Sequence, residues 1–160
     1  MTVQDLQQLL AYWREGSDYD WGTAQSLLRA KRYPYALFMG HLSLEKLLKG
    51  LIVKETRDHA PFTHNLAYLA GKLPFEFSKE RIVFLEEINS FNIEARYPDE
   101  KRELYKRATK EFTRRMMKEI GLVRSLAEQG TSRPCLELLS ISPRARRELT
   151  HELKPRDQPG

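Results

Sequence analysis

Residues 34–55 read PYALFMGHLSLEKLLKGLIVKE and, written as a helix, carry apolar side chains over most of the circumference. A helix of this kind is typically buried among others rather than lying on a surface. One polar stripe interrupts the pattern, because His41, Glu45 and Lys49 recur every four residues and therefore share a face. We expect this stripe to lie where the helix meets another part of the protein. A second polar side lies roughly opposite and is expected to face solvent; it holds Ser43, Lys46, Gly50 and Lys54.

The composition of the 160 residues bounds what the chain can be. The length predicts one domain, with room for a tail. The single cysteine, Cys135, excludes a disulfide framework within the chain and any multi-cysteine metal site, and we expect a cytoplasmic location. The opening MTVQDLQQLL lacks the pattern of a signal peptide, and no apolar run approaches the roughly 20 residues of a membrane span. The net charge of +5 permits binding of nucleic acid or nucleotide without requiring it.

Four further helices are predicted from helical spacing of apolar residues. Residues 3–30 form either one long helix or two collinear pieces, because Gly16-Ser17-Asp18 could interrupt them. Residues 65–73 form a short helix capped by Thr63 or His64, and Ser78 caps a helix that ends near Arg96. A last helix starts at Asp99 or Glu100 and runs to Glu128. The fold class is therefore all-α, an antiparallel up-and-down bundle of four to five helices.

The character of the sequence changes at Gly130, where several prolines interrupt a basic segment. We therefore divide the chain into a helical bundle, residues 1–129, and a tail, residues 130–160, with a possible short helix at 144–153. Part of the tail is too apolar for a free linker and is expected to dock on the bundle or on another chain; this part holds Leu136, Leu138, Leu139 and Ile141.

Four motifs, taken in order along the chain, suggest a family. They are WGTAQSLLRAKRYPYALFMGH at 21–41, LEKLLKGLI at 44–52, His64-Asn65-Leu66, and ARYPD at 95–99. Over roughly residues 5–128 the chain resembles the HEPN domain (higher eukaryotes and prokaryotes nucleotide-binding domain). The resemblance implies a bundle of four or five helices that usually dimerises. It also implies a prokaryotic protein of a kind that often partners a small, separately encoded nucleotidyltransferase.

One branch of the family that this chain resembles consists of metal-independent RNases, including toxins of toxin–antitoxin pairs. Those use an Arg followed a few residues later by a His. In this sequence Arg96 is followed by Tyr97-Pro98-Asp99-Glu100-Lys101-Arg102, without a histidine. Arg–His pairs near this spacing do occur at Arg57 and His64, and before His151 in the tail, but chance alone accounts for such matches. The ARYPD form is similar to the branch that lacks the catalytic pair.

Two interpretations of the candidate site remain open. In the first, a ligand or phosphate group is bound by a pocket whose residues are His41, Glu45, Lys49, His64, Arg96 and Tyr97. In the second, Glu45 forms ion pairs with Lys49 and Arg96 that only tie helices together. His41 would then be a hydrogen-bonded core histidine, and Arg96 would cap carbonyl groups while Tyr97 packs on the last helix. Asn89 and Asn92 are expected at the surface.

We therefore interpret the chain as a non-catalytic HEPN-type accessory subunit, associated with nucleotide or RNA and paired with a small nucleotidyltransferase. The alternatives are a stand-alone nucleotide-binding protein and a metal-independent RNase toxin. We expect a homodimer, with no catalytic residue, metal ion, cofactor or membrane association.

Overall fold

The structure, a computed structural model, describes residues 1–130, without the side chains of residues 98–101 and 129–130. Within these residues the chain is helical and contains no strand, so the predicted all-α class is confirmed. The apolar residues 136–141 and the predicted helix at 144–153 lie outside the described residues. The helices are α1 (Val3–Arg29), α2 (Tyr33–Thr56), α3 (Leu66–Ala70), α4 (Lys79–Arg96), α5 (Pro98–Arg107) and α6 (Lys110–Gly130).

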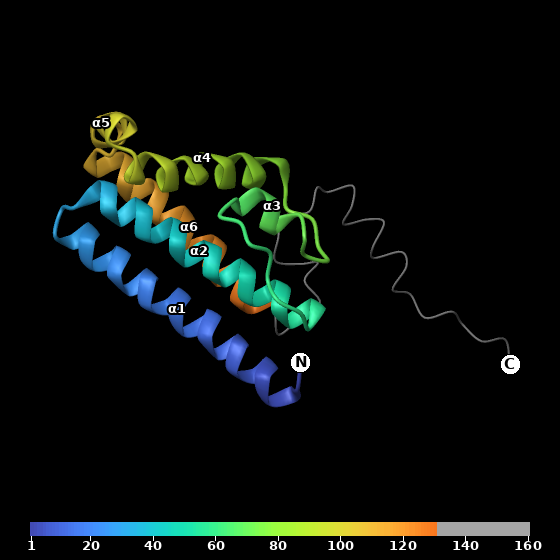
Figure 1. The fold of residues 1–160 in the computed structure, drawn as a ribbon. Helices are drawn as coiled ribbons and strands as arrows, with labels where there is room; N and C mark the ends of the chain where they lie inside the picture. Colours follow the sequence, from blue (N-terminus) through green and yellow to red (C-terminus); the bar gives the residue numbers. More distant parts are fainter. Residues whose placement is uncertain (131–160) are drawn as a thin grey trace, which may run out of the picture.

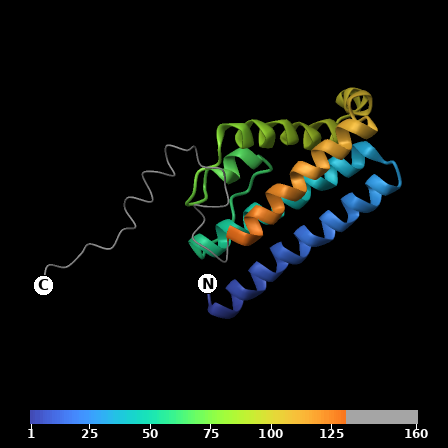
Figure 2. The same ribbon diagram turned by 180° about the vertical axis from the view of Figure 1, so that it is seen from behind.

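Helix α2 is the centre of the bundle (Figure 1). It packs along its length against α1, and it also contacts α3, α4, α5 and α6. Figure 2, from behind, shows α6 running alongside α2. Helices α1 and α4 lie on opposite sides of this pair. This central position explains why residues 34–55 are apolar nearly all round: Leu37, Leu44, Leu48 and Val53 are all fully buried.

Close packing of α2 against α6 depends on a small residue. A Cβ placed on Gly40 would lie 2.8 Å from Cδ1 of Ile120 and 3.4 Å from the sulfur of Met117. An alanine at Gly40 would therefore force the side chain of Ile120 to shift within the contact between the two helices.

Helix α1 is one uninterrupted helix, which settles the alternative left open by the sequence. Thr2 and Asp5 form a reciprocal capping box at its start. Gly16-Ser17-Asp18 does not break it, because tertiary contacts use these residues. The Ser17 hydroxyl donates to the carbonyl of Ser43 at 2.8 Å, and Gly16 admits the side chain of Lys46.

The last predicted helix is divided in two, so the prediction of one helix from 99 to 128 is wrong. Helix α5 ends at Arg107, Ala108 leaves the helical conformation (φ −77°, ψ 58°), and α6 begins at Lys110. The Thr109 hydroxyl accepts from the backbone N–H of Phe112 at 3.2 Å and so starts α6. Helix α5 lies across the end of the bundle as a result (Figure 1).

Two smaller expectations are also wrong. The cap of α3 is Asn65, whose side chain accepts from the backbone N–H of Tyr68 at 3.0 Å, rather than Thr63 or His64. Ser43, expected to face solvent, is fully buried. Its burial follows from Arg124 of α6, which reaches between α1 and α2 and donates hydrogen bonds to the hydroxyl groups of both Ser17 and Ser43.

None of the helices within residues 1–130 combines the length and the apolar character that crossing a bilayer requires.

Candidate functional site

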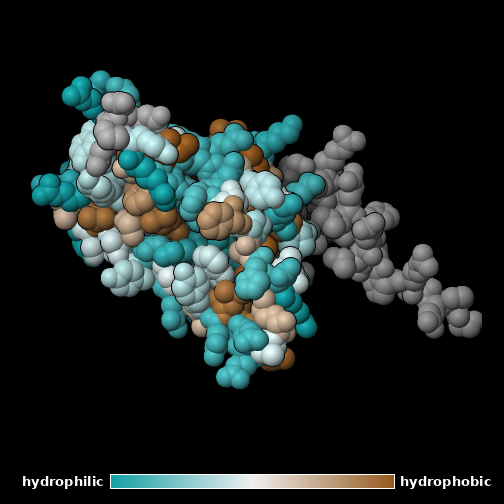
Figure 3. Space-filling model, viewed as in Figure 1, coloured by the Kyte–Doolittle hydropathy of each residue, from teal (hydrophilic) through white to brown (hydrophobic). Residues whose placement is uncertain are grey.

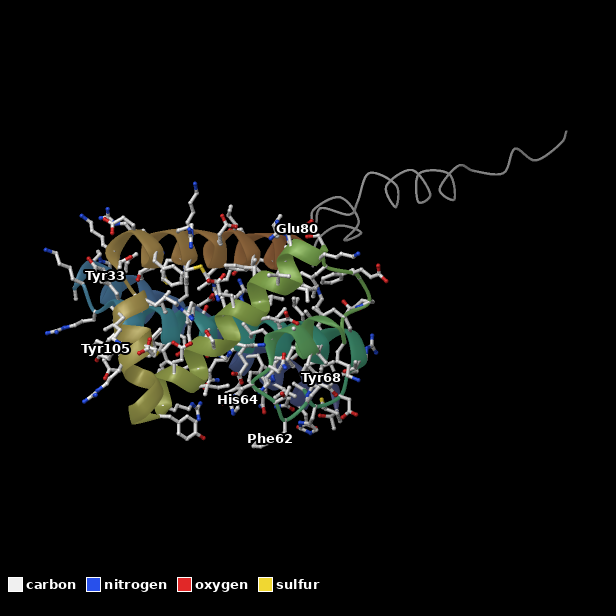
Figure 4. All side chains as sticks on the ribbon, turned by 90° about the horizontal axis from the view of Figure 1, so that it is seen from above. Tyr33, Phe62, His64, Tyr68, Glu80 and Tyr105 are labelled. Atoms are coloured by element: carbon white, nitrogen blue, oxygen red, sulfur yellow. The ribbon has the colours of Figure 1, made fainter. Side chains whose placement is uncertain are left out.

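The polar stripe of α2 is buried and forms the centre of the candidate site. His41, Glu45 and Lys49 all lie inside the bundle, as their common spacing predicted. His64, from the loop before α3, meets Glu45 there, and Asn92 reaches the same place from α4. Figure 4 shows His64 and Phe62 on the same side of the bundle, away from the end that carries Tyr33 and Tyr105. The structure thus brings together residues from α2, α4 and an intervening loop.

Glu45 is the acceptor on which this cluster depends. Its Oε1 accepts a hydrogen bond from Nζ of Lys49 at 2.8 Å, and its Oε2 lies 3.0 Å from Nδ1 of His64. Burial acts to raise the pKa of Glu45, but the hydrogen bonds and charges of Lys49 and His64 outweigh it and leave the pKa below its usual value. Glu45 is therefore a buried carboxylate that stays ionised at neutral pH.

His41 is a neutral, hydrogen-bonded core histidine. Its Nε2 lies 3.1 Å from the carbonyl oxygen of His64, which can only accept, so Nε2 carries the proton. Nδ1 then faces the side-chain amide of Asn92 at 3.5 Å as an acceptor. Burial lowers the pKa of His41 to about 4, although the nearby Glu45 acts to raise it. With both ring nitrogens engaged inside the protein, His41 positions the His64 loop.

Arg96 and Tyr97 are not brought into this cluster. The Arg96 guanidinium lies over the ring of Phe38, 5.9 Å from its centroid, and Tyr97 is largely exposed. Within the described residues Arg96 forms no ion pair with Glu45, so the expected tie between them is wrong. Lys49, which does pair with Glu45, also lies over the ring of Trp13, with its Nζ 5.4 Å from the ring centroid. Four of the six candidate residues therefore share one site.

Two asparagines that sequence reasoning assigned to the surface hold the site in place. Asn92 is only 5% exposed and contacts His41. Asn89 accepts from the backbone N–H of Leu66 at 2.8 Å and donates to the side chain of Asn65 at 3.1 Å, which fixes the start of α3 beside His64. The spacing of Asn89, Asn92 and Arg96 along one edge of α4 was a usable signal for this role.

The comparison with family models decides the identity of this bundle. The model described as "HEPN domain" matches residues 10–129, which is most of the chain. The chain belongs to the HEPN domain family. The crystal structure of TT1696 from Thermus thermophilus is similar to this HEPN domain in fold, with a TM-score of 0.64 at 20% sequence identity. The match covers 75% of this chain and 96% of that one. No curated protein gave a significant match.

The chemistry open to this HEPN site is that of an exposed imidazole backed by a buried carboxylate. The His64 side chain is 55% exposed, and its Nδ1 is held by Glu45, so Nε2 is left to meet a ligand or a proton donor. The charge of Lys49 is matched by Glu45, so the cluster offers no surplus cation for a phosphate group. Within residues 1–130, no group of three or more His, Cys, Asp or Glu side chains is placed to hold a metal ion.

Proposed function

We propose that this HEPN domain is a non-catalytic accessory protein, associated with nucleotide or RNA, that works as a homodimer beside a small nucleotidyltransferase. Family membership supports the association with nucleotide or RNA. The pairing with a nucleotidyltransferase rests on the resemblance to HEPN proteins that have such partners. The absence of catalysis and the presence of a protein interface are argued from residues of α4 and the segment that follows it.

The observation that carries the proposal is the environment of Arg96 at the junction of α4 and α5. An RNase of the family would need a histidine a few residues after this arginine, and the sequence through Arg102 has none. The Arg96 guanidinium is engaged with Phe38, and His41 is buried and neutral. These features support a protein that does not cleave RNA through this junction.

Exposed apolar side chains support a protein interface. Val83 and Ile93 are more than half exposed on α4, and the exposed ring of Tyr97 follows directly after that helix. Val83 and Ile93 lie within roughly 80° of each other around α4, so both belong to its outward side. An apolar face of this kind suits a second copy of the chain or a partner protein.

The proposal is tested by isolating the tagged chain from its source cells and identifying what accompanies it. We expect a nucleotidyltransferase as the main companion, encoded by a neighbouring gene. Recovery of the chain without any nucleotidyltransferase, together with the absence of such a gene nearby, would reject the pairing. The variant Ile93→Glu should reduce recovery of the partner or of the dimer, whereas Tyr19→Glu, the same kind of change at an exposed position of α1, serves as the matched control.

One observation favours a second candidate, a metal-independent RNase. The contact between His64 and Glu45 resembles an acid–base histidine oriented by a carboxylate. For this candidate, expression would arrest growth and purified protein would cleave RNA without added metal. His64→Ala would abolish both effects, and His59→Ala, in the same exposed loop, would leave them unchanged. Persistence of cleavage in His64→Ala would exclude His64 as the acid–base group, and the absence of cleavage by the wild type would exclude the candidate.

A further inference from the structure

The fold gathers the positive charge of the chain at one end of the bundle. The turn between α1 and α2 lies at this end, as do α5 and the start of α6, although about 70 residues of sequence separate them. Figures 1 and 2 show this arrangement from both sides, and α5 contacts both α2 and α4. We name this surface, made by residues 29–35 and 98–115, the basic end.

The charge of the basic end exceeds that of the whole protein. Its residues include ten Lys and Arg against four Asp and Glu, a surplus of six, whereas the complete chain has a surplus of five. The remainder of the chain is therefore close to neutral. In Figure 3 strongly hydrophilic side chains cover the corner of the molecule at α5.

The cations of the basic end fall into those that contact other side chains and those that do not. In the first group, Lys106 pairs with Glu103, and Arg107 pairs with Glu94 and lies over the rings of Phe91 and Phe112. Five other exposed cations form no ion pair, side-chain hydrogen bond or ring contact within the described residues, and these are Lys31, Arg32, Arg102, Lys110 and Arg114. Their charge is available to a ligand.

Exposed tyrosines lie among these cations. The side chain of Tyr105 on α5 is 51% exposed, and Tyr35 in the first turn of α2 is 39% exposed. Figure 4 places Tyr105 at the same end as Tyr33. Aromatic rings between Lys and Arg residues suit a single-stranded nucleic acid, because the rings stack on unpaired bases and the cations bind phosphates. An acidic protein surface would need only the cations, so substitution of Tyr105 distinguishes the two kinds of ligand.

We propose that the basic end binds a single-stranded nucleic acid, through phosphate contacts from Arg32 and Lys110 and base stacking on Tyr105. This inference deepens the proposed function, on which it rests for the association with nucleotide or RNA. It assigns that association to a surface apart from the site around His64 and Glu45.

Fluorescence anisotropy with labelled oligonucleotides of about 12 nucleotides, one of uridine and one of thymidine, tests the inference on the purified chain. We expect binding at about 50 mM salt that weakens steeply towards about 200 mM. Tighter binding of the uridine oligonucleotide would identify RNA as the ligand. Equal binding of the two oligonucleotides would show that the basic end accepts single-stranded RNA and DNA alike. Failure to bind either oligonucleotide at low salt, or tighter binding of a duplex, would overturn the inference.

Matched variants locate the binding surface. Arg32→Glu with Lys110→Glu should weaken binding at least about tenfold and reduce the salt slope by about 1.4, the value for two lost phosphate contacts. Both positions are at helix N-termini, where an acid is tolerated. Lys72→Glu with Lys79→Glu changes the net charge equally near α3 and should bind as the wild type does. Equal weakening by both pairs would overturn the proposed location.

Stacking is tested at Tyr105. Tyr105→Leu should weaken binding about tenfold, and Tyr105→Phe, which keeps the ring, should not. Equal effects of both substitutions would contradict stacking. Because no partner protein is present in these measurements, they fail or succeed independently of the pairing with a nucleotidyltransferase.

Discussion

Nδ1 of His64 lies 3.0 Å from Oε2 of Glu45, so a half-exposed imidazole is held by a carboxylate buried in the central helix. This contact ties the loop before α3 to α2. The same carboxylate accepts from Lys49, whose side chain is itself buried. Glu45 is therefore the residue on which the local charge balance depends.

Glu45→Gln should destabilise the protein by about 3 kcal/mol, because it leaves the Lys49 ammonium buried without a counter-charge. Urea unfolding at neutral pH measures the effect. The exposed pair of Glu103 and Lys106 provides the control, since Glu103→Gln should leave the unfolding midpoint unchanged. A midpoint for Glu45→Gln equal to that of the wild type would show that the buried pair does not stabilise the fold.

Stability should fall as the pH is lowered from 7.5 to 5, because His41 has a folded-state pKa of about 4 against an ordinary 6.5. The unfolded state binds the proton in this range and the folded state does not, so protonation favours unfolding. The expected loss is about 2 kcal/mol. The pH at which Glu45 titrates lies below this range, since its pKa is lowered.

His41→Gln should remove this pH dependence, and urea unfolding at both pH values measures it. His59→Gln, in an exposed loop, is the control and should retain it. If His41→Gln lost as much stability between the two pH values as the wild type does, the burial of a neutral His41 would be wrong.

Arg124→Ala should destabilise the protein by about 3 kcal/mol, because Arg124 joins three helices. Its guanidinium bonds Ser17 on α1 and Ser43 on α2, and it pairs with Asp18 at 2.8 Å. Arg124→Lys keeps the charge but not the planar fork of donors, so it should recover only part of the loss. Thermal melts of both variants, with the exposed Arg114→Ala as control, check this. Full recovery by lysine would show that only the charge matters.

Two glycine substitutions should change stability in opposite directions. Gly22→Ala in α1 meets nothing within 4 Å and should stabilise the helix by about 0.5–1 kcal/mol. Gly40→Ala should destabilise by about 1–3 kcal/mol, because its Cβ would crowd Ile120. Thermal melts measure both. A stabilising Gly40→Ala would mean that α2 and α6 are packed less closely than their contact indicates.

The helices that sequence analysis located best are those whose signals are local. Pro34 lies in the first turn of α2, and the Ser78 side chain caps α4 by accepting from the backbone N–H of Arg81. The break at Ala108 and Thr109 was missed because apolar residues continue at helical spacing across it, from Leu104 to Phe112 and Met116. Thr109 before a charged first turn was the available signal, but the periodicity of the core side chains outweighed it.

The candidate site was predictable as far as helical spacing reaches. The spacing of His41, Glu45 and Lys49 placed them on one face, and His64 was proposed because it precedes the third predicted helix, in the His64-Asn65-Leu66 motif. The pairing of Arg96 with Phe38, and the joining of Ser17, Ser43 and Arg124, depend on how separate helices pack. No local pattern encodes such contacts, because they join residues up to 107 positions apart.

We propose that this HEPN domain acts as an accessory to a nucleotidyltransferase rather than as an enzyme. The most direct measurement is size-exclusion chromatography with light scattering on the chain produced together with the nucleotidyltransferase of a neighbouring gene. We expect one complex containing both proteins, with two copies of this chain. Separate elution of the two proteins, with this chain alone cleaving RNA through His64, would contradict it.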